Sequence, residues 1–304
     1  MTAFPGPRKA TGMGIAQTTL SPAGTAQKPT QNPSNDALSA LLTLGRPLVM
    51  GILNVTPDSF SDGGQFIDPA NAIAHAGQMA KQGADILDIG AESTRPYGGA
   101  KPVSSDDELA RLAPVLPAIV KLGLPVSIDT IKASVATWAL DRGATIVNDV
   151  WGLQRDPEMA KLVAARGVPV IVMHNRDNAD ESIDIIADVV AFFNRSLEIA
   201  ARAGIAREKI VLDPGIGFGK TPEQSILCLA RLSKFRRFGL PLLVGASRKR
   251  FINSVTPSEP DDRIGGSIAS HLLAVENGAA IVRVHDVKET VQALRVASAI
   301  GAAK

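Results

Sequence analysis

The sequence predicts a single-domain α/β protein, a (β/α)8 TIM barrel preceded by a disordered N-terminal extension. From Leu48 onward, apolar runs with the composition of β-strands alternate with longer amphipathic stretches that have helical spacing. Eight such strand–helix pairs fit into about 255 residues, which is the usual length of this barrel. Near-continuous apolar strands between helices are typical of a parallel sheet covered by helices. An open, doubly wound sheet is the alternative architecture.

The first 37 residues differ from the rest of the chain. They are rich in Pro, Gly, Thr, Ala and Gln and show no sustained periodicity. Such a composition offers too little apolar surface to fold, so we predict a flexible extension over residues 1–37 and the barrel over residues 38–304. A transit peptide is a weaker alternative, because the segment contains few arginines and serines.

Each predicted strand is a short apolar run that ends in polar residues. In chain order, the strands are expected within "LVMGILNV", "ADILDIGAE", "PVSIDT", "TIVNDV", "PVIVMHN", "KIVLDPG", "PLLVGAS" and "AIVRVHD". Helices are expected between them, for example over residues 68–84 and 182–204, where apolar residues recur at helical spacing.

The composition narrows the classes of function. The net charge of +2 gives no overall case for binding nucleic acid or a membrane surface, so any anion site must be a local cluster. No apolar run reaches about 18 residues, the length that a membrane-spanning helix needs. The single cysteine, Cys228, excludes an internal disulfide and suits a reducing compartment. We therefore expect a cytoplasmic protein that acts on small molecules.

Polar side chains concentrate where the predicted strands end. In chain order these residues are Asn54, Asp88, Glu92, Asp129, Asn148, Asp149, His174, Asn175, Asp213, Ser247, Arg248, Lys249, Arg283 and His285. A single polar residue at a strand end is usually a cap or a turn residue, but the beginnings of these strands show no comparable pattern. Since all strand ends of a barrel meet at its C-terminal face, where active sites lie, the pattern favours a polar functional site.

The residue types at this face predict a ligand with two parts. Hydrogen-bond acceptors that suit a flat heterocycle rich in N–H groups are supplied by Asp129, Asn148 and Asp213. Donors and positive charge that suit a phosphate or diphosphate are supplied by Lys249, Arg283 and His285. The histidines are too scattered for a zinc site, whereas Mg²⁺ held mainly by a substrate diphosphate fits the sequence.

The segment "DPGIGFGK", residues 213–220, is rich in glycine and follows a predicted strand. It does not match the G-x-x-x-x-G-K-[ST] frame of a Walker loop. Its alternating glycines allow the backbone to come close to a planar ligand, although a plain flexible turn is the alternative. Phe218 in this segment is either a stacking wall for the ligand or an anchor for the loop.

Seven motifs occur in order between about residues 46 and 300: "GILNVTPDSFSDGG", "DIGAESTRP", "SIDT", "IVNDV", "DPGIGFGKT", "GASRKRFI" and "RVHDV". With these motifs the sequence resembles the dihydropteroate synthase family, the folate-pathway transferases that sulfonamides inhibit. The resemblance implies a (β/α)8 barrel that condenses 6-hydroxymethyl-7,8-dihydropterin diphosphate with 4-aminobenzoate, giving 7,8-dihydropteroate and diphosphate. It also implies Mg²⁺ as the cofactor, no covalent enzyme intermediate, and a homodimer.

The resemblance further implies roles for individual residues. The pterin would contact Asp129, Asn148, Met173, Asp213 and Lys249. The diphosphate would contact Asn54, Arg283 and His285, and Mg²⁺ would bind Asn54. Two mobile loops would help to form the aminobenzoate pocket from Phe60, Thr94, Arg95, Pro96, Phe218 and Ser247. Catalysis, by loss of diphosphate and then attack of the amine, would involve Asp58, Asp129, Lys249, Arg283 and His285.

Two alternatives stay open at this point. A methyltetrahydrofolate methyltransferase uses a related pterin-binding barrel, but it does not need the segment "SRKR" or the pair Arg283 and His285, which serve a diphosphate. A non-catalytic pterin-binding paralogue is left open by the unusual segment "MHNRDNADES" after the fifth strand. The presence of Asn54, Asp129 and Lys249 argues against this paralogue.

Overall fold

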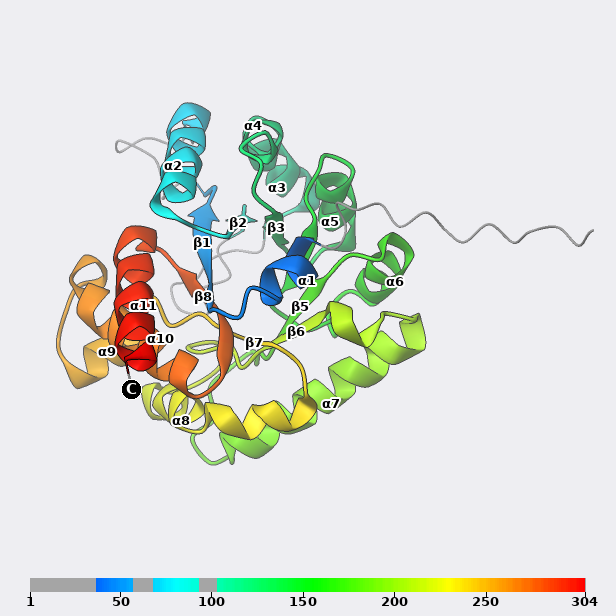
Figure 1. The fold of residues 1–304 in the computed structure, drawn as a ribbon. Helices are drawn as coiled ribbons and strands as arrows, with labels where there is room; N and C mark the ends of the chain where they lie inside the picture. The colour runs from blue at the N-terminus through cyan, green and yellow to red at the C-terminus, as the bar shows by residue number, and fades with distance from the viewer. Residues whose placement is uncertain (1–36, 57–67, 93–102, 304) are drawn as a thin grey trace, which may run out of the picture. The chain divides into compact units, whose positions relative to one another are not determined.

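The structure is a computed structural model that describes residues 37–56, 68–92 and 103–303, all of them within one compact unit. Eight parallel strands form a closed barrel in sequential order (Figure 1). The strands are β1 (Leu48–Asn54), β2 (Ile86–Gly90), β3 (Val126–Asp129), β4 (Ile146–Asp149), β5 (Val170–Met173), β6 (Ile210–Asp213), β7 (Leu242–Val244) and β8 (Ala279–Val284). Because β1 pairs with both β2 and β8, the predicted barrel is confirmed and the open sheet is excluded.

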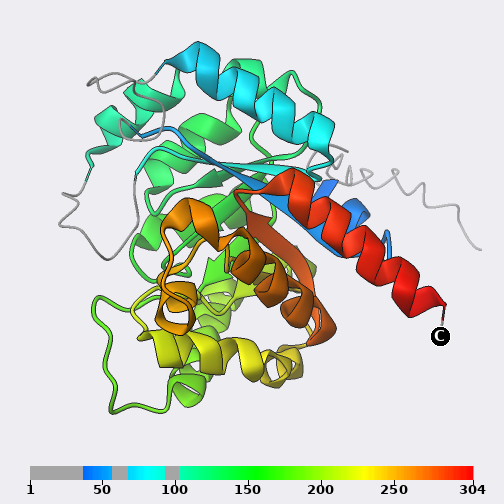
Figure 2. The same ribbon diagram turned by 90° about the vertical axis from the view of Figure 1, so that its left-hand side faces the viewer.

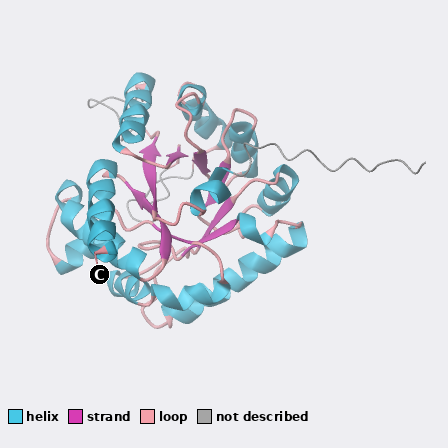
Figure 3. Cartoon of the chain, viewed as in Figure 1, coloured by secondary structure: helices cyan, strands magenta, loops and turns pink. Residues whose placement is uncertain are grey.

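Helices surround the strands on the outside of the barrel (Figure 3). The α-helices are α1 (Ala37–Leu42), α2 (Pro69–Gln82), α3 (Ser105–Leu112), α4 (Leu116–Val120), α5 (Ala133–Leu140), α6 (Pro157–Arg166), α7 (Ile185–Ala203), α8 (Pro222–Ala230), α9 (Arg250–Val255), α10 (Ile264–Glu276) and α11 (Val287–Ala302). Within the described ranges, the short 3-10 helices are η2 (Arg207–Lys209), η3 (Leu232–Phe238) and η4 (Pro260–Arg263). The last helix, α11, packs on the outside against α2 and β1 (Figure 2).

Local sequence signals set the helix ends. The side chain of Asp68 caps the first turn of α2, Pro69 occupies its first position, and Gly83 closes it with a left-handed φ of 100°. A reciprocal capping box between Thr221 and Gln224 starts α8. These signals fix the strand–helix boundaries, and the boundaries fix which residues end each strand.

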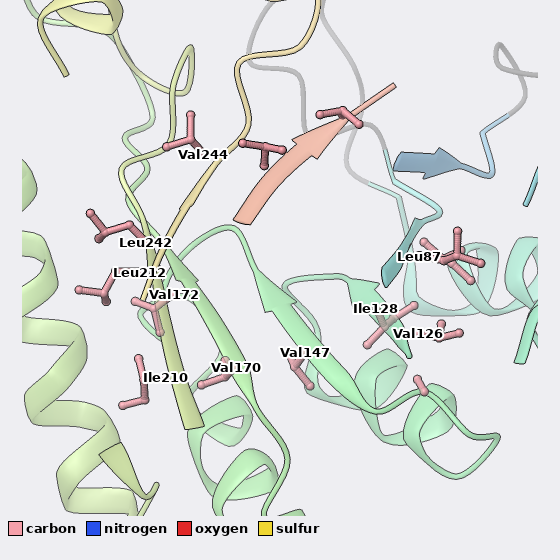
Figure 4. Packing of buried hydrophobic residues seen from close by; sticks show 14 of the residues in the cluster. Leu87, Val126, Ile128, Val147, Val170, Val172, Ile210, Leu212, Leu242 and Val244 are labelled. Atoms are coloured by element: carbon pink, nitrogen blue, oxygen red, sulfur yellow. The ribbon is translucent and has the colours of Figure 1, made fainter. Parts of the chain in front are cut away.

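An outer apolar layer holds the helices on the barrel. Its strand residues alternate with the residues that point into the barrel, as expected for the two-residue repeat of a strand. They include Leu87, Val126, Ile128, Val147, Val170, Val172, Ile210, Leu212, Leu242 and Val244 (Figure 4). Each fully buried side chain of this kind contributes about 1.5–3 kcal/mol, so this layer provides much of the stability that supports the site.

An inner apolar layer closes the N-terminal end of the barrel. It comprises Leu48, Met50, Ile86, Ile146, Ile171, Val211, Leu243 and Ile281, together with Leu38 from α1. Helix α1 lies over the middle of the ring of strands in Figure 1, with Leu38 only 2% exposed. The N-terminal half of the barrel is therefore filled by side chains, and the C-terminal half is where a ligand can bind.

Helix α1 also bears on the predicted N-terminal extension. Residues 1–36 of that extension lie outside the described residues, whereas Ala37, its predicted last residue, begins α1. Helix α1 was not predicted, because its six residues, "ALSALL", are too few to show a helical period.

Candidate active site

Polar residues form a layer directly above the inner apolar layer. Asp88, Asn148, Asp213 and Arg283 each lie two positions after a strand residue of that apolar layer, so they point into the barrel one level nearer its C-terminal face. Asp129 joins them because it is paired in register with Asn148 on the neighbouring strand. The strand repeat alone therefore gathers residues from β2, β3, β4, β6 and β8.

The Arg283 side chain connects this polar layer. Its Nε atom lies 2.6 Å from Oδ2 of Asp88, and its Nη2 atom lies 2.7 Å from Oδ2 of Asp129. Asn148 donates from Nδ2 to the same Asp88 oxygen at 3.1 Å. Asp88 is fully buried, and the side chain of Arg283 is only 16% exposed. One guanidinium thus balances two buried carboxylates, which leaves a net negative charge at the floor of the site.

Within the described part of the chain, two carboxylate oxygens of this network are buried and have no hydrogen-bond partner. They are Oδ1 of Asp88 and Oδ1 of Asp129, and the hydroxyl of Ser127 on the same wall is also unpartnered. Buried polar atoms almost always have partners, and each unsatisfied one costs about 1–3 kcal/mol. Unused acceptors in the open half of a barrel are suited to the N–H groups of a heterocyclic ligand.

Burial changes the acid–base behaviour of the acceptors. It raises the pKa of Asp129 to about 7, against the lowering influence of Arg283 and with added repulsion from Asp88. Burial also raises the pKa of Asp213 to about 6, although the backbone N–H of Gly215 donates to its Oδ1 at 2.7 Å. Both carboxyl groups therefore change charge between about pH 6 and pH 7, close to neutral pH.

These pKa values predict that the affinity for a free pterin rises with pH. Below pH 6 both carboxyl groups are mainly protonated and accept hydrogen bonds poorly, whereas above pH 7 both are ionised. Affinity for 6-hydroxymethylpterin should thus be about tenfold lower at pH 5 than at pH 7. Calorimetric titration from pH 5 to 7 checks this, and Asp213→Asn should make the dependence shallower, because Asp213 then no longer changes charge while Asp129 still does. An affinity that is constant over this range in the unmodified protein would contradict the prediction.

An apolar wall stands beside the acceptors. Phe218 forms a buried cluster with Val150 and Met173, against which Trp151 packs. The Nζ atom of Lys249 lies 4.0 Å from the centre of the Phe218 ring, a cation–π contact. The loop of residues 213–220 thus places Phe218 as an apolar wall beside the acceptors, against Lys249.

Ser247 and His285 lie together where β7 and β8 end. The hydroxyl of Ser247 is 3.0 Å from Nδ1 of His285 and accepts the backbone N–H of His285 at 3.2 Å. Burial, reinforced by Arg283, lowers the pKa of His285 to about 3. At neutral pH this lowered pKa makes the ring a neutral hydrogen-bonding group, so Arg283 and Lys249 carry the positive charge of the predicted donor set.

Arg248, between Ser247 and Lys249, is held in an unusual backbone conformation. Its φ of 58° lies in the left-handed region, which residues other than glycine rarely adopt. Its guanidinium forms two hydrogen bonds to Asp286, at 2.6 and 3.1 Å, and a third at 2.5 Å to Asp261. The paired Arg248 and Asp286 thereby fasten the loop after β7 to the end of β8.

Replacing Asp286 with asparagine should therefore lower the free energy of unfolding by about 1.5–3 kcal/mol, because a charge-assisted, partly buried bidentate pair loses its charge. Urea-induced unfolding measures the change. The matched control is Glu158→Gln, which removes the charge of a highly exposed ion pair with Lys161 and should change stability by no more than about 0.5 kcal/mol. Equal effects of the two substitutions would contradict this account of the Arg248 pair.

The structure brings most of the predicted site residues together. Around the open end of the barrel lie Asn54, Asp129, Asn148, Met173, Asp213, Phe218, Ser247, Lys249, Arg283 and His285. The remaining predicted residues, Asp58, Phe60, Thr94, Arg95 and Pro96, lie outside the described residues.

Some polar strand ends serve the fold instead of the site. Glu92 accepts the backbone N–H of Val103 at 3.0 Å and pairs with Lys132 at 2.6 Å. Asp149 points away from the barrel interior and caps the following turn by accepting the backbone N–H groups of Trp151 and Leu153. Polarity at a strand end is therefore informative only when the strand repeat also directs the side chain inward.

Asp88 is the site residue that the sequence-based assignment left out. Its position two residues after Ile86 was the available signal, because it gives Asp88 the same inward direction as the inner apolar layer. Residues 37–56, 68–92 and 103–303 contain no group of three His, Cys, Asp or Glu side chains suited to hold a metal ion. The same residues include no helix with the length and apolar character needed to cross a membrane.

Comparison with known proteins agrees with this geometry. Residues 50–285 match the pterin-binding enzyme family. A dihydropteroate synthase from Bacillus subtilis is 46% identical over 86% of this chain and 91% of its own length. A crystal structure of dihydropteroate synthase from Clostridium difficile, obtained in the presence of pteroic acid, is 50% identical and covers 84% of this chain and 97% of its own, with a TM-score of 0.80.

A second solved structure contains one of the two expected substrates. It is the dihydropteroate synthase of Xanthomonas albilineans with 4-aminobenzoic acid, 45% identical, covering 85% of this chain and 94% of its own, with a TM-score of 0.81. The family match spans most of the chain, and the relatives are matched over nearly their whole length. The chain therefore belongs to the dihydropteroate synthase family of pterin-binding enzymes.

Proposed function

We propose that the open end of this barrel binds 6-hydroxymethyl-7,8-dihydropterin diphosphate and joins it to 4-aminobenzoate, with release of diphosphate and 7,8-dihydropteroate. This is the folate-pathway reaction of the family to which the chain belongs. One observation above all supports the choice of site: Asp129 has a buried oxygen without a hydrogen-bond partner among the described residues, beside Asn148 in the open half of the barrel. The pteroic acid and 4-aminobenzoic acid named with the two solved relatives support the choice of substrates.

The pterin ring is proposed to lie on the polar layer. Its N–H groups would donate to Asp129 and Asp213, and Asn148 would supply both a donor and an acceptor. Met173 and Lys249 would contact the faces and edge of the ring. The support is the arrangement already described, in which acceptors form the floor and the Phe218 wall stands beside them.

The diphosphate is proposed to contact Asn54, Arg283 and His285. The donor set fits Mg²⁺ that arrives with the substrate, because Asn54 offers one amide oxygen and the described residues contain no separate metal-binding cluster. Mg²⁺ usually keeps several waters and binds through substrate phosphates with one or two protein oxygens. When bound, it would neutralise negative charge on the departing diphosphate.

In the proposed reaction, the carbon–oxygen bond to the diphosphate breaks first, and the electron pair leaves with the diphosphate. The positive charge that develops on the pterin is stabilised by the net negative charge of Asp129 and Asp88 around Arg283. The amine nitrogen of 4-aminobenzoate then forms the new bond to the same carbon, and its proton passes to the released diphosphate. Lys249 takes no covalent part, since its cation–π contact with Phe218 supports a binding role.

The aminobenzoate is proposed to lie between Phe218 and Ser247. The family resemblance adds Phe60, Thr94, Arg95 and Pro96 to this pocket and gives Asp58 a catalytic part, but these residues lie outside the part of the chain that the structure describes. Support for the two described residues is the position of Phe218 against Lys249 and of Ser247 against His285, on neighbouring strand ends.

A homodimer in the cytoplasm is also proposed. Large apolar side chains are exposed on the adjacent helices α8, α9 and α10, namely Ile226, Leu227, Val255 and Leu273. Such a group of exposed apolar residues is typical of a protein–protein interface. The lone cysteine, Cys228, is buried and unpaired, which suits a reducing compartment.

A direct assay tests the proposed function. Purified protein is mixed with the pterin diphosphate, labelled 4-aminobenzoate and Mg²⁺, and labelled dihydropteroate is expected in amounts that grow with enzyme concentration. A protein that binds both substrates but forms no product above the blank would support the non-catalytic paralogue instead. Methyl transfer from methyltetrahydrofolate, without formation of dihydropteroate, would support the methyltransferase.

A further inference from the structure

A buried lysine lies behind the site and has no part in the reaction proposed above. Lys220 ends the glycine-rich loop after β6 and is only 1% exposed. Burying an ammonium group is costly unless hydrogen bonds satisfy it, and the burial lowers the pKa of Lys220 to about 8. At neutral pH the ammonium group is thus mostly charged, and a buried charge needs hydrogen-bond acceptors around it.

Three acceptors surround the Lys220 ammonium. Its Nζ atom lies 2.9 Å from the carbonyl oxygen of Gly215, 3.1 Å from that of Phe218, and 2.7 Å from Nδ1 of His174. An ammonium has three N–H donors, so these contacts match its full capacity. A chemical role such as Schiff-base formation is incompatible with this environment, because all three donors are directed at protein atoms away from solvent.

His174 is held in the form that accepts from Lys220. Burial lowers the pKa of His174 to about 4, so the ring is neutral at pH 7. Its Nε2 atom is 2.9 Å from Oδ2 of Asp188, and Asp188 also pairs with Arg176 at 3.0 Å. The carboxylate of Asp188 can only accept, so Nε2 carries the proton and Nδ1 is free to accept from the ammonium.

The two carbonyls bound by Lys220 belong to residues that set the geometry of the site. The N–H of Gly215 donates to Oδ1 of Asp213 at 2.7 Å, while the carbonyl of the same residue accepts from Lys220. The carbonyl of Phe218 accepts from Lys220, while its ring contacts Lys249. Lys220 therefore acts on Asp213, the proposed pterin acceptor, through Gly215. It acts on the apolar wall through Phe218.

The loop between these residues has little conformational preference of its own. Gly215, Gly217 and Gly219 all have φ in the left-handed region, at 65°, 79° and 52°. A Cβ atom on Gly215 would lie 2.0 Å from the carbonyl oxygen of His174, so no other residue fits there. Because glycines gain the most conformational freedom when released, such a loop needs an external tie to hold one shape.

We infer that Lys220 is a positioning residue, whose buried ammonium fixes the glycine-rich loop so that Asp213 and Phe218 face the bound pterin and aminobenzoate together. The inference rests on the proposed function for the identity of these ligands. The hydrogen bonds themselves do not depend on that identity, so binding of a pterin can test the inference separately from turnover.

The test is the substitution Lys220→Met, which keeps a similar volume in an unbranched side chain but removes its donors. Calorimetric titration with 6-hydroxymethylpterin, well below the melting temperature, should give a Kd about tenfold higher than that of the unmodified protein. In the assay with saturating pterin diphosphate, KM for 4-aminobenzoate should also rise, by about as much. Lys220→Gln, which retains two donors for the two carbonyls, should recover part of both losses and replaces Lys220→Met if that variant does not fold.

The control is Arg46→Met, which breaks a pair of hydrogen bonds to the buried carboxylate of Asp85 at the other end of the barrel. It should lower the melting temperature while leaving Kd and KM unchanged. Unchanged Kd and KM in folded Lys220→Met, or equal rises in the Arg46→Met control, would overturn the positioning role. If the unmodified protein binds the pterin but forms no dihydropteroate, the proposed function fails, and the Kd comparison still decides the role of Lys220.

Discussion

Replacing Asp129 with asparagine is expected to lower kcat/KM for dihydropteroate formation by about 10²–10³-fold, equivalent to about 3–4 kcal/mol of transition-state stabilisation. Asparagine has almost the same shape and keeps one acceptor, but it carries no charge. The carboxylate of Asp129 is 8% exposed, is bound to Arg283 at 2.7 Å, and keeps its other oxygen free of protein partners in the described chain. Its charge should therefore matter most when positive charge develops on the pterin.

The Asp129 prediction distinguishes catalysis from binding. Most of the loss should appear in kcat, because the charge on the pterin is greatest in the transition state. The control is Asp141→Asn at the end of α5, whose side chain is 49% exposed and pairs with Arg166 on the protein surface. The control should leave kcat/KM unchanged, and a fall of less than about threefold in Asp129→Asn would contradict the electrostatic role.

Replacing Arg283 with alanine should impair both stability and substrate binding. The substitution leaves the buried carboxylates of Asp88 and Asp129 without their common cation, which should lower the free energy of unfolding by about 3–5 kcal/mol. It also removes the proposed charge-assisted hydrogen bonds to the diphosphate, each expected to be worth about 1.5–3 kcal/mol. The Kd of the pterin diphosphate should thus rise about ten to a hundredfold more than the Kd of the free pterin.

Urea-induced unfolding and two calorimetric titrations measure these effects. Arg283→Lys provides the conservative comparison, since lysine keeps the charge but cannot bind both carboxylates through a planar fork. It should recover part of the diphosphate affinity and less of the stability. If Arg283→Ala loses equal affinity for the free pterin and for its diphosphate, the proposed binding of the diphosphate by Arg283 is contradicted.

The barrel was predictable because its signals are local. Apolar runs separated by helical patterns specify strands and helices within a few residues, and the eight predicted strands all occur. The polar ends of those strands also predicted most of the residues that the structure gathers at the C-terminal face, since closure of the barrel brings all strand ends to one face. The two-residue repeat of the strands also distinguishes these polar residues from one another, because it directs Asp88 into the barrel and Asp149 away from it.

The remaining features depend on contacts that no local pattern contains. Arg283 bonds to Asp88 across 195 residues of sequence and to Asp129 across 154. The strongly lowered pKa of His285 follows from burial beside Arg283, and residue type alone does not reveal it. The contact between Lys220 and His174 spans 46 residues. It joins a glycine-rich loop to a polar loop, and neither sequence indicates that the two meet.

A crystal structure with 6-hydroxymethylpterin tests the central claim most directly, namely that the polar layer at the C-terminal face is the pterin site. The ring is expected within the barrel mouth, with its N–H groups within about 3.2 Å of Oδ1 of Asp129 and of the Asp213 carboxylate, and Phe218 beside it. A pterin bound elsewhere, with Oδ1 of Asp129 still lacking a partner, would contradict the account.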